Sequence, residues 1–300
     1  MGREKVISKL KKVVTIINPA AGNDSPVLSL LNTATHENSI TNEVLVTQKP
    51  SDVAKFARRA LKLKPDAVVV YGGDGTVVSV AKALYTYKSK VPLILLPGGT
   101  ANVIAKELLI PNDLAEALKI FGRKPKVVEL NTAAFGKEFM LLRIEVGILA
   151  KMVQQTKSEA KSSLGIIAYP ITALKEAMNA TPMKYTLTLD GKKRVVEGVG
   201  LMIANVGNIG IPGVSLQTKV SSNDGLLDVF VLTSSGLSTL VAVSSSALIG
   251  TPKPLTLKHW QVKKVSVSFM PKQVIIKDDL PVMAARFTVS MNSEKVTILV

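Results

Sequence analysis

The stretch of residues 68–76 constrains the fold of this chain more than any other part of the sequence. It reads Val-Val-Val-Tyr-Gly-Gly-Asp-Gly-Thr, an apolar run followed by a loop with three glycines, a carboxylate and a hydroxyl. A continuous apolar run that ends at glycine is typical of a strand buried on both faces of a parallel sheet. Glycines directly after the strand let backbone N–H groups approach a bulky anion. The stretch therefore predicts a phosphate-binding loop, with a plain strand-to-helix turn as the alternative.

Two further apolar runs end in loops of a similar kind. Residues 13–17 lead into Asn-Pro-Ala-Ala-Gly at 18–22, and residues 91–96 lead into Pro-Gly-Gly-Thr-Ala-Asn at 97–102. Open parallel sheets bind their ligands at the carboxyl ends of the strands. We therefore expect all three loops at the ligand-binding edge of one sheet.

Helical patterns alternate with these apolar runs. Apolar residues recur three or four positions apart over residues 52–63, with basic residues opposite, and again directly after the glycine-rich loop. Shorter helices are expected over residues 102–109 and 113–121, the second with Asp113 as its N-cap. Strands that alternate with helices predict an open parallel sheet. We assign this α/β domain to residues 1–126.

Beyond this domain the pattern changes to short strands bounded by turns. Asp190 and Gly191 predict a two-residue hairpin turn, and helical segments are expected near residues 165–179 and 236–249. The pattern predicts a second domain over residues 127–300, mostly a β-sandwich or barrel. Its expected strands are residues 127–130, 139–146, 185–189, 195–204, 227–232, 262–269, 274–277, 287–290 and 295–300.

The formal net charge of +16 favours a polyanionic partner, either nucleic acid or an anionic lipid bilayer. Aromatic residues make up only 4% of the chain, which argues against the stacking surfaces that bind single-stranded nucleic acid. We therefore predict an anionic membrane surface as partner and no nucleic acid, with a merely solvated basic surface as the alternative. A homodimer is compatible with the sequence, which does not specify the oligomeric state.

The sequence contains neither cysteine nor a run of 18 apolar residues. The lack of cysteine excludes disulfides and thiolate metal sites and is consistent with a reducing cytoplasm. The best candidate for a membrane span, residues 237–250, is short and contains four serines and a threonine. Residues 1–12 are basic and lack the apolar core of a signal peptide. We expect a cytoplasmic protein that associates peripherally with membranes.

Together the motifs resemble those of the diacylglycerol kinase catalytic-domain family, which includes sphingosine kinases, ceramide kinases and bacterial YegS-like lipid kinases. The resemblance covers nearly the whole chain in order. Gly-Gly-Asp-Gly alone is shared with NAD kinases and phosphofructokinases, but the Gly-Thr-Ala-Asn and Asp-Gly-Leu-Leu-Asp motifs separate this chain from both. The matching segments are the Asn-Pro loop at 18–22, Gly-Gly-Asp-Gly-Thr at 72–76, the loop at 97–102, a lipid-side helix at 164–174 and Asp-Gly-Leu-Leu-Asp at 224–228.

The resemblance implies a Rossmann-like N-terminal domain and a C-terminal β-sandwich, as in NAD kinases and diacylglycerol kinases, with the active site in the cleft between them. It implies phosphorylation of a lipid hydroxyl with ATP and Mg²⁺, a reaction that asks the protein chiefly for positioning and charge neutralisation. The residues then expected to contact the nucleotide are Asn18, Gly72, Gly73, Asp74, Gly75, Thr76, Gly98, Gly99, Thr100 and Asn102.

Carboxylates have the remaining roles that the resemblance implies. Asp74 cannot attract phosphate by itself, so its presence in the loop points to a bound Mg²⁺ or to the proton of the attacking hydroxyl. Asp224, backed by Asp228, would hold a Mg²⁺ in the second domain. An Asp-Gly pair such as Asp224 and Gly225 is also a plain β-turn sequence.

The chain departs from the family pattern on the acceptor side. The family has Asp-Gly-Glu-Pro, whose Glu is a candidate general base, whereas this chain has Asp278, Asp279, Leu280 and Pro281. Leu280 cannot accept a proton. Asp278 and Asp279 are the candidate catalytic replacements, and on a strand only one of the two would face the acceptor.

Three functions are compatible with the sequence. The favoured one is an ATP-dependent lipid kinase acting on diacylglycerol, a sphingoid base or another lipid alcohol. The second is a regulatory nucleotide- and lipid-binding family member with little or no kinase activity. The third, a soluble kinase for a non-lipid hydroxyl, is disfavoured by the basic composition and by the family resemblance. The sequence does not name the lipid, because acceptor selectivity depends on the shape of the site.

Overall fold

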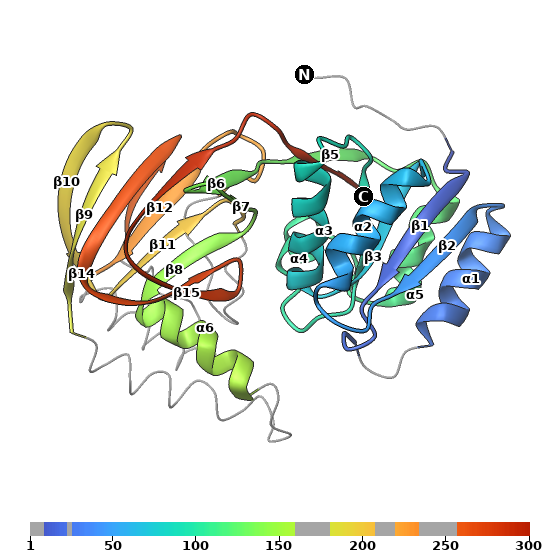
Figure 1. The fold of residues 1–300 in the computed structure, drawn as a ribbon, viewed down its shortest axis with the longest axis horizontal. Coiled ribbons are helices and arrows are strands. Elements are labelled where there is room, and N and C mark those ends of the chain that lie inside the picture. The colour runs from blue at the N-terminus through green and yellow to red at the C-terminus, as the bar shows by residue number, and fades with distance from the viewer. Residues whose placement is uncertain (1–8, 23–25, 160–180, 208–219, 234–256) are drawn as a thin grey trace, which may run out of the picture. The chain divides into compact units, whose positions relative to one another are not determined.

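The computed structural model in Figure 1 describes residues 9–22, 26–159, 181–207, 220–233 and 257–300. It divides into two units, one formed by Met1–Thr132 with Ser293–Val300 and the other by Ala133–Asn292. The expected lipid-side segment at 164–174 and the helices expected near 165–179 and 236–249 lie outside the described residues. Among the residues described, no helix is long and apolar enough to cross a membrane.

The first unit contains a six-stranded sheet in the order β2-β1-β3-β4-β16-β5. Neighbouring strands are parallel except β5, which runs antiparallel to β16. Every residue of β3 is buried, as its continuous apolar run predicts. The strands are β1 (Lys12–Ile17), β2 (Thr41–Val46), β3 (Ala67–Gly72), β4 (Leu93–Pro97), β5 (Val127–Leu130) and β16 (Val296–Leu299).

Helices cover both faces of this sheet, which confirms the predicted α/β class. α2 and α3 pack together on one face, and α1 packs with α5 on the other (Figure 1). Val53, Ala57 and Ala60 form the buried side of α2, at the helical spacing that the sequence predicts. The helices are α1 (Val27–Glu37), α2 (Asp52–Lys62), α3 (Asp74–Thr86), α4 (Val103–Glu107), α5 (Leu114–Leu118) and the 3₁₀ helix η1 (Lys119–Gly122).

Of the two short helices, α5 begins where the sequence predicts and α4 begins later. Asp113 caps α5 as predicted, because its Oδ1 accepts the N–H of Glu116 at 2.9 Å. α4 begins only after Asn102, since that residue has a left-handed backbone conformation with a φ of 46°. α4 is therefore shorter than the helix expected over residues 102–109.

The boundary between the units differs from the expected division at residue 126. β5 and the residues up to Thr132 belong to the first unit, and so do Ser293–Val300. β16 lies between β4 and β5, where it pairs Ile298 with Leu93 in parallel. The order of elements along the chain does not reveal this return, because the paired residues are far apart in the sequence.

The second unit is a β-sandwich built almost entirely from antiparallel strands, in agreement with the predicted class. Along the main path its strands follow the order β13-β12-β11-β8-β14-β15-β6-β7, while β9 pairs with β10 and β14. Alternate residues of these strands form one apolar core. The elements are β6 (Ala133–Phe135), β7 (Glu138–Met140), β8 (Arg143–Gly147), α6 (Ile148–Glu159), β9 (Met183–Leu189), β10 (Lys192–Gly198), β11 (Gly200–Ala204), β12 (Leu227–Leu232), β13 (Leu257–Val262), β14 (Lys264–Lys277) and β15 (Leu280–Met291).

Several strand bounds in this unit differ from the sequence prediction. The strand expected over residues 139–146 is two strands, β7 and β8, and the one expected over 195–204 is divided between β10 and β11. The segments expected at 262–269 and 274–277 instead contribute to the long β14, which continues across a register shift between Ser268 and Gln273. The predicted hairpin turn at Asp190 and Gly191 is confirmed, since it joins β9 and β10 with φ values of 45° and 85°.

Candidate active site

Three loops follow neighbouring strands at one edge of the first sheet. The first loop (residues 18–22) follows β1, the second loop (residues 72–76) follows β3, and the third loop (residues 97–102) follows β4. β1 lies between β2 and β3, so the connections from β1 and β3 leave in opposite directions, which is the arrangement that opens a ligand crevice in such sheets. The structure therefore places all three predicted loops at the carboxyl edge of the sheet.

Direct contacts join the second loop to its two neighbours. The Asn18 side chain donates to Thr76 Oγ1 at 3.2 Å, and the Gly98 N–H donates to the Gly72 carbonyl at 3.0 Å. A Cβ atom on Gly99 would lie only 2.5 Å from the Cα of Gly73, so the second and third loops touch through their backbones. Only glycine at both positions allows this close approach, so the second and third loops are held together at Gly73 and Gly99.

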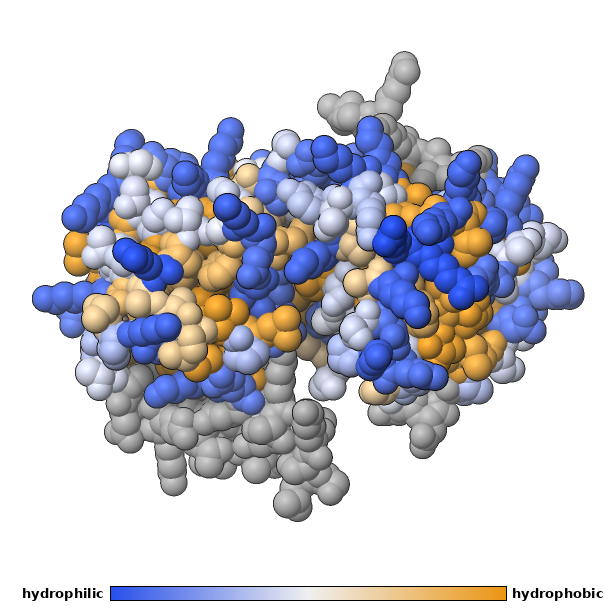
Figure 2. Space-filling model, in the orientation of Figure 1, coloured by the Kyte–Doolittle hydropathy of each residue, from blue (hydrophilic) through white to orange (hydrophobic). Residues whose placement is uncertain are grey.

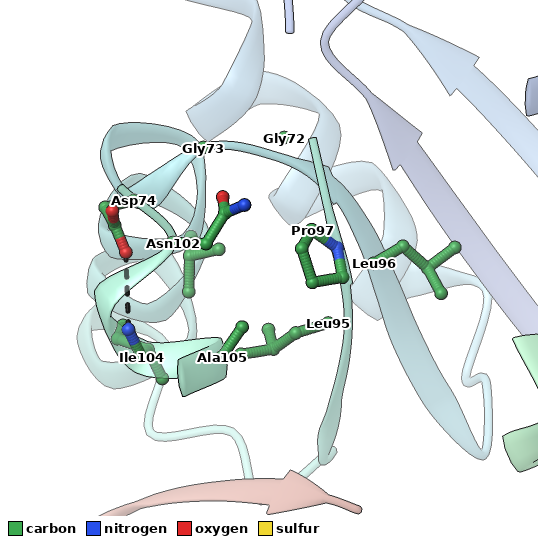
Figure 3. Close-up of a pocket in the computed structure, with 10 residues that line it drawn as sticks. Gly72, Gly73, Asp74, Leu95, Leu96, Pro97, Asn102, Ile104 and Ala105 are labelled. Atoms are coloured by element: carbon green, nitrogen blue, oxygen red, sulfur yellow. Dashed lines mark hydrogen bonds between the residues drawn. The ribbon is translucent and has the colours of Figure 1, made fainter. Parts of the chain in front are cut away.

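Asp74 is the first residue of α3 and is nearly buried, with 7% of its surface exposed. Its Oδ1 accepts the backbone N–H of Ile104 at 3.4 Å, a contact that joins the second loop to the start of α4 (Figure 3). A carboxylate at a helix N-terminus is also stabilised by the helix dipole. Asp74 is therefore held in a defined position within the second loop.

Asn102 maintains the shape of the third loop. Its amide oxygen accepts the Gly99 N–H at 2.9 Å, and its amide nitrogen donates to the Gly99 carbonyl at 2.7 Å. Figure 3 shows this side chain between Gly73 and Pro97. The structure thus gives Asn102 a role inside the loop, in addition to the nucleotide contact expected from the sequence.

The cavity drawn in Figure 3 is too small for a nucleotide. Its volume is about 10 Å³, and the residues around it come from β4, α3, α4 and the second and third loops. This is roughly the space that one water molecule requires. Gly75 and Thr100 are exposed instead. The second and third loops are therefore open to solvent at these two residues.

Asp224 and Asp228 provide the carboxylates of the expected metal site. Asp224 is exposed in a turn, where its Oδ1 accepts the Leu226 N–H at 2.9 Å. Asp228 is fully buried in β12, and burial is the largest effect that raises its pKa, with the charge of Asp224 adding to it. Asp228 Oδ2 is buried without a hydrogen-bond partner. Two neighbouring carboxylates with an orphaned oxygen suit a divalent cation such as Mg²⁺.

The described residues contain no group of three or more His, Cys, Asp or Glu side chains that could hold a metal ion. Carboxylate oxygens at Asp224 and Asp228 would therefore need backbone carbonyls or water to complete the coordination, which is usual for Mg²⁺. With that addition, the donor set fits the ion.

The partner of Asp228 has no signal in the sequence. His259 Nε2 lies 2.6 Å from Asp228 Oδ1, and the imidazole stacks on Phe230 with 4.4 Å between the ring centroids. The register of β12 and β13 pairs His259 with Phe230, two residues from Asp228 and on the same face of the sheet. Only this register brings the two polar residues together.

Asp278 and Asp279 form the turn between β14 and β15. Both have positive φ angles, 46° and 66°, as type I′ hairpin turns require, and Lys277 pairs with Leu280 across them. The expectation that these two side chains alternate across a strand was therefore wrong. The chain reverses its direction at these residues instead of extending through them.

The two aspartates have different surroundings. The Asp278 carboxylate is buried and accepts the N–H groups of Leu141 and Leu142, the shortest contact being 2.7 Å, and burial raises its pKa to about 6. The Asp279 side chain is 16% exposed and lies 3.6 Å from the Arg143 guanidinium. Asp278 thus ties the turn to the link between β7 and β8, and Asp279 is the more accessible of the two.

A buried ion pair beside this turn was missed in the sequence. Arg143 and Glu145 lie on the same face of β8 and are almost fully buried, and their side chains form an ion pair. Burial is the largest effect on the Glu145 carboxyl and raises its pKa to about 7 against the opposing effect of Arg143. The available signal was the i, i+2 spacing of opposite charges within a strand, which places both on one face.

We expect the free energy of unfolding to fall as the pH rises from about 5 to about 8. The folded-state pKa of Glu145 lies above its ordinary value of 4.5, so its contribution to stability is complete below that value and is lost as the pH passes through about 7. One pKa unit corresponds to about 1.4 kcal/mol, which gives a loss on the order of 3 kcal/mol. Urea unfolding at a series of pH values measures it.

Glu145→Gln should reduce this pH dependence, because it removes the titrating group. The remaining slope has the same sign, since burial also raises the pKa of Asp278. Glu197→Gln, at an exposed position of β10, is the matched control and should keep the wild-type slope. Wild-type stability that rises between pH 5 and pH 8 would contradict the expectation.

Known proteins resemble both units of the chain. Residues 12–133 match the diacylglycerol kinase catalytic domain, and residues 143–285 match the YegS C-terminal NAD kinase beta sandwich-like domain. A probable lipid kinase YegS-like protein of Klebsiella pneumoniae is 30% identical over 221 residues, which are 73% of this chain and 73% of that protein. An uncharacterized protein of Synechocystis sp. is 30% identical over 292 residues, which are 91% of this chain but only 66% of that protein.

Solved structures show the same fold. A diacylglycerol kinase from Bacillus anthracis superimposes with a TM-score of 0.77 at 24% sequence identity, and the match covers 98% of each chain. At this identity the solved structures show the fold alone. The match to the Klebsiella pneumoniae protein reaches 30% identity and covers 73% of that protein. With its two consecutive domain matches, this chain belongs to the diacylglycerol kinase catalytic-domain family, among the YegS-like lipid kinases.

Proposed function

We propose that this protein is an ATP-dependent lipid kinase that transfers the γ-phosphoryl group of ATP to the hydroxyl of a lipid alcohol. The observation that carries the proposal is the set of three loops at the carboxyl ends of β1, β3 and β4, with the second and third in backbone contact at Gly73 and Gly99. Such loops offer several N–H groups to one polyphosphate. Membership of a family of lipid kinases supports a lipid as the acceptor.

The residues of the first unit would position the nucleotide. Backbone N–H groups of residues 72–76 and 98–100 would bind the phosphates, and the N-terminus of α3 adds a favourable dipole. Thr76 and Thr100 offer hydroxyl donors. Asn18 would contact the nucleotide directly, and it also holds Thr76 in place. Asn102 would keep the third loop in the conformation that binds the nucleotide phosphates.

Carboxylates of both units would bind Mg²⁺ or accept the proton of the attacking hydroxyl. When bound, Mg²⁺ neutralises the charge that develops on the phosphoryl oxygens. Asp74 would bind the ion of the nucleotide or accept the proton of the attacking hydroxyl. Asp224 and Asp228 would hold an ion in the second unit. Asp279 would be the alternative proton acceptor on the acceptor side, since the Asp278 carboxylate is already bonded to backbone N–H groups.

A second function, a nucleotide- and lipid-binding regulator with little or no kinase activity, is favoured by one observation. Leu280 replaces the family's candidate base and is 63% exposed, so its side chain supplies no chemistry at that position. Incubation of the protein with labelled ATP, Mg²⁺ and mixed micelles of single lipid alcohols distinguishes the two functions. Diacylglycerol, sphingosine and ceramide serve as acceptors, and glycerol tests a soluble one.

Label in one of the lipids supports the kinase. Label in none of them, with intact nucleotide binding, supports the regulator instead. Label in glycerol alone would contradict both and would favour a soluble kinase.

MgADP and MgATP are expected to raise the thermal unfolding midpoint of the protein. A ligand that binds only the native state stabilises it, by about 2.7 kcal/mol when the ligand is present at 100 times its Kd. A thermal shift series with and without EDTA measures the effect and its dependence on Mg²⁺. An unchanged midpoint at millimolar nucleotide would remove the central support of the proposed function.

Binding to anionic vesicles is expected to weaken steeply with salt. Figure 2 shows hydrophilic residues spread over the visible face, and two exposed basic clusters stand out in the structure. One comprises Lys192, Lys193 and Arg194 on β10, beside Val195, which is 63% exposed. The other comprises Lys55, Arg58 and Lys62 on α2. Each basic residue near an anionic bilayer contributes about 1 kcal/mol within about a Debye length.

The β10 cluster should contribute more to vesicle binding than the α2 cluster, because the exposed side chain of Val195 lies beside it. Charge reversal of all three β10 residues should therefore release the protein from phosphatidylserine vesicles, whereas reversal on α2 serves as the matched control. Cosedimentation at low and high salt measures both. Equal binding to neutral and anionic vesicles would contradict the prediction that the basic residues bind an anionic membrane.

A further inference from the structure

Tyr71 links the first and third loops from within β3. It is the residue directly before the glycine-rich loop, and only 3% of its surface is exposed. Its backbone carbonyl accepts the Asn18 N–H at 2.9 Å, so its main chain already holds the start of the first loop. Its side chain belongs to the apolar cluster on the face of the sheet that α1 and α5 cover.

The phenol ring of Tyr71 lies against one glycine from each of the two loops. A Cβ atom on Gly98 would be 2.9 to 3.2 Å from three ring atoms, Cζ, Cε2 and Cε1. A Cβ atom on Gly22 would be 2.0 Å from the hydroxyl oxygen. Gly22 also has a φ of +90°, a conformation that side-chain-bearing residues rarely adopt. Both glycines therefore provide the space that the ring occupies.

No hydrogen bond between described residues joins the first loop to the third. Each of these loops is bonded to the second loop or to the neighbouring backbone. The tyrosine ring packs against both loops, and beside it a Cβ atom on Gly22 would be 3.7 Å from the Gly98 carbonyl oxygen. The side chain is rigid beyond its two rotatable bonds, so its length fixes a minimum separation. The phenol is protonated at neutral pH, and burial raises its pKa further.

We propose that Tyr71 is a positioning residue that sets the distance between the first and third loops and thereby the affinity for the nucleotide phosphates. The proposal rests on the proposed function, because it concerns the same three loops. Donors from separate loops bind one polyphosphate best when they converge at fixed positions. A smaller residue at position 71 would remove the ring that packs against both loops and so release the first loop from its position, whereas phenylalanine would maintain the spacing.

Calorimetric titration of four variants with MgADP tests this proposal. Tyr71→Ala should weaken binding at least tenfold, and Tyr71→Phe should remain within about threefold of wild type, because the ring is retained. In steady-state assays Tyr71→Ala should raise the KM for ATP and leave the KM for the lipid alcohol unchanged. A residue that only stabilised the fold would not separate the two KM values.

Gly98→Ala provides the second arm of the test, since its Cβ would press on the ring. Alone it should weaken MgADP binding, but in combination with Tyr71→Ala it should add no further loss, because the ring it meets is gone. Unfolding midpoints of the ligand-free wild type, Tyr71→Ala, Gly98→Ala and the double variant should show the same non-additivity. Tyr71→Ala binding as tightly as wild type, or losses that simply add, would overturn the proposal.

The two proposals fail in different ways. If the wild-type protein binds no MgADP, the proposed function fails. In that case the unfolding midpoints of the ligand-free proteins still test the role of Tyr71. Non-additive midpoints show that Tyr71 contacts Gly98, and additive midpoints overturn the spacing role as well. If the wild type binds MgADP and Tyr71→Ala binds equally, only the role of Tyr71 fails.

Discussion

The kcat of the Asp74→Asn variant is expected to fall by about 10²–10⁴-fold, the usual contribution of a positioned acid–base group. Asn retains the size of the side chain and an oxygen that can accept the Ile104 N–H, so the contact between the second loop and α4 should survive. What the variant loses is the negative charge, which both a metal-binding and a proton-accepting role require. Labelled-ATP turnover with the best lipid acceptor measures the effect.

The control for this variant is Asp113→Asn, which removes another carboxylate at the start of a helix. Asp113 caps α5 and is not one of the residues of the three loops, and Asn is an equally good N-cap residue. It should leave both stability and turnover near wild type. Normal turnover in Asp74→Asn, with its fold confirmed by thermal unfolding, would remove Asp74 from the mechanism.

The variants Asp278→Asn and Asp279→Asn should affect different properties, the first stability and the second turnover. Asp278 is buried and accepts the N–H groups of Leu141 and Leu142, so its replacement should destabilise the protein by about 1–3 kcal/mol. Turnover per folded molecule should change little. Asp279→Asn should leave stability nearly unchanged and lower turnover by about 10²–10⁴-fold if this residue accepts the proton.

Leu280→Glu completes this experiment, because it restores the family's residue on the exposed end of β15. If neither aspartate matters and Leu280→Glu raises turnover sharply, the chain is a member that has lost its base. If Asp74→Asn alone removes activity, Asp74 is the remaining candidate for the proton acceptor, and the turn at residues 278–279 is structural. Equal losses in both aspartate variants would contradict the separation of roles argued from their surroundings.

The three loops could be predicted because their signals are local. A buried β-branched run, glycines after it and a helical pattern beyond them lie within about 20 residues, and the carboxyl-edge rule then places the loops together. The N-cap at Asp113 and the hairpin at Asp190 are local in the same sense. Each depends on a few adjacent residues, so no knowledge of distant pairing was needed.

Features that depend on register could not be predicted. Asp228 meets His259 only because β12 and β13 pair in one particular alignment. Asp278 reaches the Leu141 N–H across the sheet, and its turn conformation is stabilised by that distant backbone contact. Shifting either pairing by one residue would turn the side chains to the other face. A single sequence contains no observation that fixes such alignments.

The return of β16 to the first sheet has a consequence for biosynthesis. Domains generally fold in order as they leave the ribosome, but this sheet needs Val296–Leu299 between β4 and β5 before its hydrogen-bond ladder is continuous. The loop-bearing unit must therefore wait, with an open edge on β4, until the whole sandwich has been translated. A fragment that stops at residue 132 should be prone to aggregation, and a soluble isolated unit would need β16 joined to β5 by a short designed linker.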